Sequence, residues 1–361
     1  MNKTVAARDS SLDSLRGIDV LLMILVNVQG SAEAAFATFV HAEWHGLTFA
    51  DLIFPIFLLI VGLSAPLALD KPGHVISWTA IGRRAFLLFV IGVLLGWLIR
   101  PTLDPDQIRW AGVLQRIAIV YLACAGVLSL RRSVAWPLAV AMALLVAHSW
   151  MLLNVGTPGG APAGMEPGQG ISGWLDQNLI PGRVLRESWD PEGILSTLTA
   201  IANGLIGVAV MRWMLGNPVS HARLALAGII FVAAGLVLTP VLPLNKNLWT
   251  ASFALVTSGI GILFWSGLKA LWSRHGDNPI AWWTVSLGQA ALTLYVVHTV
   301  LIAIIVRRLP SGATIWEVTY QALARAGLPP PVTSLLYAVI AAALSCAILP
   351  WLKRRGWVLK V

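Results

Sequence analysis

The stretch Phe49–Leu69, FADLIFPIFLLIVGLSAPLAL, decides the fold class, because Asp51 is its only charged residue. A helix of about 20 apolar residues crosses a hydrocarbon core of about 30 Å. We expect an all-α polytopic membrane protein in which residues 1–361 form a single domain. About ten such segments recur along the chain, at 18–36, 49–69, 80–99, 111–130, 134–153, 194–215, 223–240, 250–270, 284–306 and 332–351.

The composition agrees with a membrane protein. Of the 361 residues, 57% are hydrophobic and 11% are charged, and the mean hydropathy is +0.78; soluble domains carry about 25% charged residues. Multi-span proteins collect Lys and Arg in cytoplasmic loops, so the net charge of +9 does not indicate nucleic acid. With both termini in the cytoplasm, sixteen Lys and Arg lie on that side and eight on the other. We expect this orientation in a bacterial inner membrane.

The connections are short except for residues 154–193, which are rich in Gly and Pro and are placed on the exoplasmic side. This loop is too short to bury a core and too long for a turn, so we interpret it as a lid or binding loop. Cys124 and Cys346 lie in apolar runs and are interpreted as small core residues. The spacing of Gly92 and Gly96 indicates ordinary helix packing, with a homodimer as the alternative. No metal-binding motif is present.

Three polar residues fall inside apolar segments, where charged groups usually face a partner or a functional path. Asp19 is explained either by hydration or pairing with Arg16, or by a function. Arg116 cannot lose its proton and needs a partner, so structural pairing and function remain open. His298 is more typical of a buried core histidine than of a catalytic one.

Two loop motifs carry further polar groups. In Trp189–Thr197, Asp190 is expected to be the N-cap of the following helix, and Glu192 to complement its dipole. Capping alone would explain both residues. Leu244–Trp249 places two carboxamides and an ammonium beside a Trp. This motif indicates either a hydrated loop with an aromatic anchor or a polar binding rim.

A polar block between two apolar segments contains His41, ten residues before Asp51. A neutral imidazole can attack a thioester or take a proton from an attacking amine. Histidine suits both roles because its usual pKa of about 6.5 leaves it neutral near physiological pH. The block is therefore a candidate site of proton or acyl chemistry at a membrane edge.

Taken in order, these motifs resemble the heparan-α-glucosaminide N-acetyltransferase family of transmembrane acyltransferases. Agreement in order is more specific than any one motif. The chain departs from the pattern at His45, where animal members carry Asn, so the identity of the acceptor is left open. The motifs that carry the resemblance are Asp13–Gly17, Asn27, His41–Pro55, Gly112–Ala118, Asp190–Gly193 and Asn245–Thr250.

The resemblance implies transfer of an acetyl group from cytoplasmic acetyl-CoA to the amine of an exoplasmic amino sugar of the glucosamine type. The family's active histidine matches His41, as nucleophile or general base. Asp51 would orient the ring, and Asn27 would donate to the thioester oxygen.

Candidate binding residues follow from charge. Arginines suit the CoA phosphates, although positive-inside topology explains the cytoplasmic ones equally well; the expected residues are Arg16, Arg83, Arg84 and Arg116. The exoplasmic groups expected to hold the cationic sugar are Asp190, Glu192, Asn245 and Asn247. Two other functions remain open: a secondary transporter for sugars or amino sugars, and a membrane O-acyltransferase.

Overall fold

The computed structural model describes residues 9–70, 73, 75–276 and 278–359, and its regular elements there are helices. The longer elements are α1 (Ser10–Asn27), α2 (Phe49–Leu69), α3 (Trp78–Ile99), α4 (Val113–Leu130), α5 (Ala135–Asn154), α7 (Ile194–Gly216), α8 (His221–Leu238), α9 (Ala251–His275), α11 (Ala291–Ile305) and α13 (Pro330–Ala347). The shorter ones are η1 (Ala37–Phe39), η2 (Pro105–Gln107), α6 (Gly170–Leu179), α10 (Pro279–Gly288), α12 (Ile315–Ala324) and α14 (Leu349–Arg354).

Within the described chain, eight helical segments are long and apolar enough to cross a membrane. They are α2, α3, α4, α5, α7, α8, α9 and the continuous pair α13–α14. The pair α10 and α11, bent by 74° at a short break, would make a ninth span. The expectation of an all-helical polytopic protein is confirmed, with a number of spans near the expected ten.

The first helix corrects the expected segment 18–36, because it begins at Ser10 and ends at Asn27. Its start is fixed by Asp9, whose carboxylate accepts hydrogen bonds from the backbone N–H of Ser11 (3.0 Å) and Leu12 (3.2 Å). Hydropathy alone placed the helix too late, because its first half carries charged side chains.

Helix α1 packs against α2, α9, α10 and α13, so Asp13 and Asp19 lie inside the bundle. Arg16 donates to Asp13 (2.8 Å) rather than pairing with Asp19. Asp19 is buried, and its Oδ2 has no hydrogen-bond partner among the described residues. His298 is buried as expected and lies 3.3 Å from the Leu294 carbonyl.

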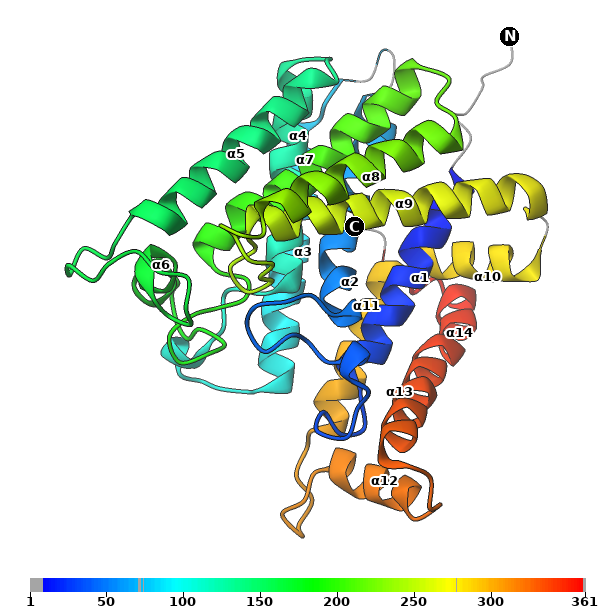
Figure 1. Cartoon of the computed structure of the whole chain (residues 1–361). Helices are drawn as coiled ribbons and strands as arrows, with labels where there is room; N and C mark the ends of the chain where they lie inside the picture. The colour runs from blue at the N-terminus through cyan, green and yellow to red at the C-terminus, as the bar shows by residue number, and fades with distance from the viewer. Residues whose placement is uncertain (1–8, 71–72, 74, 277, 360–361) are drawn as a thin grey trace.

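Helices α5, α7, α9 and α8 pack in that order on one side of the molecule, and α1 and α10–α14 lie on the other (Figure 1). Helix α2 joins the two sides and packs closely on α7. A Cβ at Gly62 would meet the backbone of Gly204, so glycine permits this close approach. The order of the packed helices brings the loop before α2 next to the loop before α9.

The long loop at 154–193 contains α6, which packs against α5 and α7. Cys124 on α4 and Cys346 on α13 are free thiols, and Cys124 is buried. Gly92 packs on Gln115 of α4, which accounts for that glycine within one chain.

Four cations used to orient the chain lie outside the described residues: Lys3, Arg8, Lys71 and Lys360.

Candidate functional site

The centre of the site is a hydrogen bond between His41 and Asp51. His41 Nδ1 lies 2.8 Å from Asp51 Oδ1. The Asp51 side chain is 1% exposed and the His41 side chain is 45% exposed. A carboxylate only accepts hydrogen bonds, so this contact places the imidazole proton on Nδ1 and leaves a lone pair on Nε2. The arrangement is one that a nucleophilic or basic imidazole requires.

Local sequence explains why Asp51 is held so firmly. It is the third residue of α2, and its Oδ2 accepts from the backbone N–H of Thr48 (3.0 Å), which is the N-cap. The same oxygen accepts from the Thr48 hydroxyl (3.0 Å) and from the Ala42 backbone (3.1 Å). The helix start therefore fixes the carboxylate that orients His41.

Lys246 is a third member of this cluster that the sequence prediction left out of the site. Its Nζ lies 3.0 Å from both His41 Nδ1 and His41 Nε2, and 3.8 Å from Asp51 Oδ1. Burial lowers the pKa of Lys246, and the Asp51 carboxylate opposes that shift. The signal was present in the motif Leu244–Trp249, but nothing in the sequence placed that loop against His41.

Two further contacts join the loops. The Gly46 backbone N–H donates to the Leu244 carbonyl (2.7 Å), and Asn245 Nδ2 lies 3.2 Å from His45 Nδ1. Asn245 is fully buried, and its Oδ1 accepts from the Leu248 backbone (2.8 Å). In this structure Asn245 holds the loop, while Asn247 beside it is half-buried.

The Asp190–Glu192 motif forms a second cluster, built on Arg109. The guanidinium donates to both oxygens of Asp190 (2.9 and 2.6 Å) and to Glu192 (2.5 Å). Although burial raises the pKa of Asp190, the bonds from Arg109 hold it below its usual value. This cluster ties the long loop to the segment before α4.

The expected helix cap is wrong in detail. Helix α7 begins at Ile194 with Gly193 as N-cap, so Asp190 lies three residues too early to be the cap. Asp176 of α6 accepts from the backbone N–H of Ile194 (2.9 Å) and of Asp190 (3.1 Å) instead. A distant carboxylate does the capping, which no local spacing could indicate.

Arg116 lies beneath this cluster and is fully buried. Its Nη2 donates to the Gly193 carbonyl (3.2 Å) and to Ser196 Oγ (2.5 Å), and its guanidinium lies 4.9 Å from the Trp249 ring centroid. Its Nε and Nη1 have no hydrogen-bond partner among the described residues. The described residues therefore satisfy only part of the hydrogen bonding that a buried arginine needs.

Asn27 is the last residue of α1 and is exposed. Its Nδ2 lies 3.5 Å from His298 Nε2 on α11, a long contact. The described contacts thus connect Asn27 to α11, and they do not include His41 or Asp51.

A cavity of about 680 Å³ runs along α2. Its lining includes Phe54 near the start of that helix and Ala68 near the end, which are about 20 Å apart along the helix axis. Arg16 and Arg84 line it, and the Arg84 guanidinium lies 4.7 Å from the Tyr121 ring centroid. Because Phe54 lies one turn beyond Asp51, the cavity extends toward the His41 cluster.

The four predicted phosphate-binding arginines are thus divided. Arg16 and Arg84 lie on the cavity, together with the carboxylates Asp9 and Asp13. Arg83 is exposed and is not among the described lining residues. Arg116 is not among the described lining residues and instead contacts Gly193 and Ser196.

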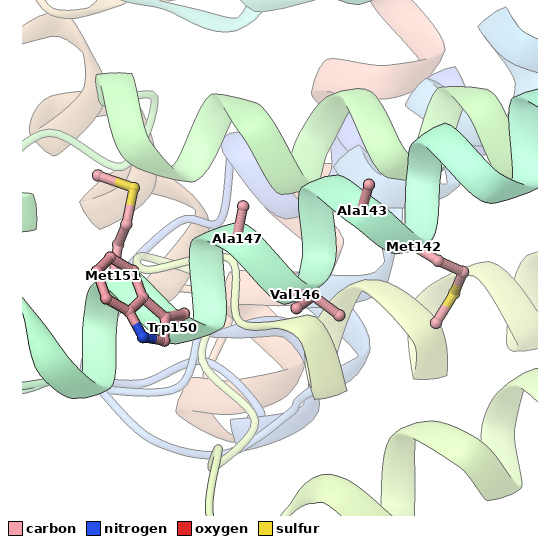
Figure 2. Close-up of a pocket in the computed structure, with 6 residues that line it drawn as sticks. All are labelled: Met142, Ala143, Val146, Ala147, Trp150 and Met151. Atoms are coloured by element: carbon pink, nitrogen blue, oxygen red, sulfur yellow. The ribbon is translucent and has the colours of Figure 1, made fainter.

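A second hollow, of about 670 Å³, lies along one face of α5. All of its lining residues come from that single helix, as Figure 2 shows, and Met142, Val146 and Trp150 are exposed apolar side chains. A stripe of this kind is typical of a helix face turned to lipid. It adds no chemical group to the site.

Comparison with known proteins bears on the segment that contains His41 and Asp51. Residues 8–164 match the family described as heparan-alpha-glucosaminide N-acetyltransferase, catalytic. Over these residues the chain is similar to this family. The resemblance expected from the ordered motifs is thereby confirmed for that part of the chain.

Two relatives extend the similarity beyond the family segment. The heparan-alpha-glucosaminide N-acetyltransferase of Homo sapiens is 29% identical, and the match covers 80% of this chain and 52% of the relative. That of Mus musculus is 28% identical and covers 71% of this chain and 48% of the relative. The chain spans about half the length of the curated relatives it matches.

Proposed function

We propose that this protein is a transmembrane N-acetyltransferase, which transfers the acetyl group of acetyl-CoA to the amine of an amino sugar of the glucosamine type. The single observation that carries the proposal is the His41–Asp51 pair, with 2.8 Å between Nδ1 and Oδ1, at the end of α2 toward which the long cavity extends. The family of residues 8–164 supports the same class of reaction.

The donor would lie along α2. Its anionic end would meet Arg16 and Arg84, because guanidinium groups bind phosphates through paired hydrogen bonds. Its thioester would extend toward Phe54, one turn from Asp51. Arg16 lies near the beginning of the chain, which the excess of Lys and Arg assigns to the cytoplasm. Acetyl-CoA would therefore enter from the cytoplasm, and the acceptor from the opposite face.

The acceptor would approach His41 between the two joined loops. His41 Nε2 can take a proton from the attacking amine or attack the thioester carbon itself. Glu192 adds a carboxylate that attracts a cationic sugar, and its charge acts on Lys246 at the centre of the site. Asp190 and Asn245 would support this rim, and Asn247 would contact a sugar hydroxyl.

The test uses purified protein in detergent with radiolabelled acetyl-CoA and glucosamine. We expect an alkali-stable amide product. An alkali-labile product would identify an O-acyltransferase, and the absence of any product would favour a transporter.

The variant pair His41→Ala and His45→Ala assigns the reaction to one histidine. His41→Ala should abolish transfer without loss of the folded protein, because nearly half of that side chain is exposed. His45→Ala should reduce activity by a smaller factor. Activity of His41→Ala within a few fold of the parent would refute the assignment.

A further inference from the structure

Lys246 places a primary amine of the protein against the imidazole of His41. Its Nζ lies 3.0 Å from both His41 Nε2 and His41 Nδ1. A point equally far from both ring nitrogens lies over the face of the ring and not along the Nε2 lone pair, which is in the ring plane. The amine is therefore on the side from which it would attack an acyl group carried on Nε2.

The loop that carries Lys246 is held from both sides. Asn245 is buried and binds the Leu248 backbone (2.8 Å). Trp249 is 1% exposed, has a positive φ of 53°, and donates from Nε1 to Asn203 Oδ1 (2.6 Å). Because the loop holds Lys246 beside His41, the effective concentration of its amine toward an acyl group at His41 is high.

The chemical state of Lys246 also favours attack. Burial lowers the pKa of Lys246, and the Asp51 and Glu192 carboxylates oppose this shift, while Arg116 adds to it. The neutral amine is the nucleophilic form. A lowered pKa therefore gives Lys246 a larger neutral fraction than an exposed lysine has at the same pH.

The donor cavity and the Lys246 loop meet at one aromatic contact. Phe54 lines the cavity, and its ring centroid lies 5.4 Å from that of Trp249, three residues after Lys246. A thioester that extends along the cavity toward His41 would therefore approach Lys246 as well.

We propose that Lys246 is an internal acyl acceptor, which takes the acetyl group onto Nζ when no amino sugar is bound. The inference rests on the proposed function, since it needs acetyl-CoA as donor. The Nζ–C bond forms and the C–S bond of the thioester breaks. Lysine enters as an ammonium and loses two protons, one to the departing CoA thiolate and one through His41 to water. The products are N-acetyl-Lys246, CoA thiol and a proton.

Acetylation would remove the charge of Lys246 and place an amide against His41. The modified protein would be a poorer transferase, and bound amino sugar would protect it. Incubation with acetyl-CoA alone should therefore lower the transfer rate measured afterwards, and the same incubation with glucosamine present should not.

The experiment treats purified full-length protein with isotopically labelled acetyl-CoA, without acceptor, and measures label on each lysine by peptide mass spectrometry over time. Lys269 is the internal control, because it is also a partly buried lysine that binds a carboxylate, Asp9 at 2.9 Å, and it lies on α9 away from His41. We expect label on Lys246 at least about tenfold faster than on Lys269. His41→Ala should abolish this excess, and Lys246→Arg should prevent the loss of activity on incubation.

Two results would overturn the inference. Label that reaches Lys246 equally fast in His41→Ala would show plain chemical acetylation of an accessible amine. Lys246 that stays unlabelled in the parent would also refute it. Glucosamine acetylation in the same preparation then separates the two proposals: if it proceeds, the proposed function stands without the internal acceptor, and if it does not, both fail.

Discussion

His41 Nδ1 and Asp51 Oδ1 lie 2.8 Å apart, although one residue belongs to an irregular loop and the other to the first turn of α2. The same carboxylate also receives the backbone of the helix N-cap, so its position is set by the start of the helix. The orientation of the His41 ring and the capping of α2 therefore depend on one side chain.

Replacing Asp51 by Asn tests this double role. The change removes the charge that orients the imidazole, and we expect kcat for acetyl transfer to fall about 100-fold or more. Thr48→Ala is the matched control, because it deletes the hydroxyl that donates to Asp51 Oδ2 (3.0 Å) and leaves the carboxylate in place. It should cost about 1 kcal/mol of stability and change kcat by a few fold at most. Equal kcat losses in the two variants would mean that Asp51 acts only through folding.

Arg83 and Arg84 are adjacent in the sequence, and Arg84 lines the cavity. We expect Arg84→Gln to raise the Km for acetyl-CoA roughly tenfold or more, since a charge-assisted hydrogen bond contributes about 1.5–3 kcal/mol. The Km for glucosamine should stay the same. Arg83→Gln should change neither value by more than about twofold, and steady-state kinetics with each substrate varied in turn measures both. A larger effect at Arg83 would move the phosphate site out of the cavity.

Glu192 and Asp190 both bind Arg109, and the charge of Glu192 also acts on Lys246 beside His41. We therefore expect Glu192→Gln to raise the Km for glucosamine about tenfold, with the Km for acetyl-CoA unchanged. Asp190→Asn breaks a buried ion pair, and should cost about 3–5 kcal/mol of stability with little change in either Km. Thermal unfolding measures the stability of both variants, and steady-state kinetics measures their Km values for the two substrates. If Glu192→Gln only lowers the melting temperature, its role is structural.

Asp176 predicts a pH-dependent contribution to stability. Burial raises the pKa of Asp176 to about 6, against the hydrogen bonds it accepts from Ile194 and Asp190. Between about pH 4 and pH 6 the folded protein therefore holds a proton that the unfolded chain releases, so this contribution is present in acid and is lost as the pH rises. Relative to Asp176→Asn, the parent should lose roughly 2–3 kcal/mol between pH 4 and pH 7. Unfolding curves of the two proteins that stay parallel over this range would contradict the assignment.

The orientation can be tested with single cysteines in a background without Cys124 and Cys346. Ala161→Cys is exposed in the long loop and avoids the positive φ of 86° at neighbouring Gly160. In intact cells an impermeant thiol reagent should label Ala161→Cys and should leave His275→Cys unlabelled until the membrane is opened. The reverse pattern would invert the topology and the direction of acetyl transfer.

Most of the membrane architecture could be predicted from the sequence, because long apolar runs have few alternatives in a bilayer. The expected first segment, 18–36, was misplaced because charged side chains lie inside the first helix. Helix α1 begins at Ser10 although Asp13, Arg16 and Asp19 lower its hydropathy. Packing inside the bundle compensates for these charges, and packing is not visible in a local window.

The site was predictable only in part. His41 and Asp51 share one motif and were predicted together, whereas Lys246 lies 205 residues from His41 along the chain. Of the four predicted arginines, two line the cavity, and only the helix positions separate them from Arg83 and Arg116.

The sequence by itself determined the helical membrane class, the similarity of residues 8–164 to one family, and the pairing of His41 with Asp51, because each depends on composition or on neighbours in one segment. The tertiary structure alone decided which distant side chains meet. It brought the loop before α9 onto the loop before α2, placed Lys246 at His41, and gave Asp176 the cap of α7. Such contacts depend on how the helices pack in three dimensions, which the spacing of residues along the chain does not indicate.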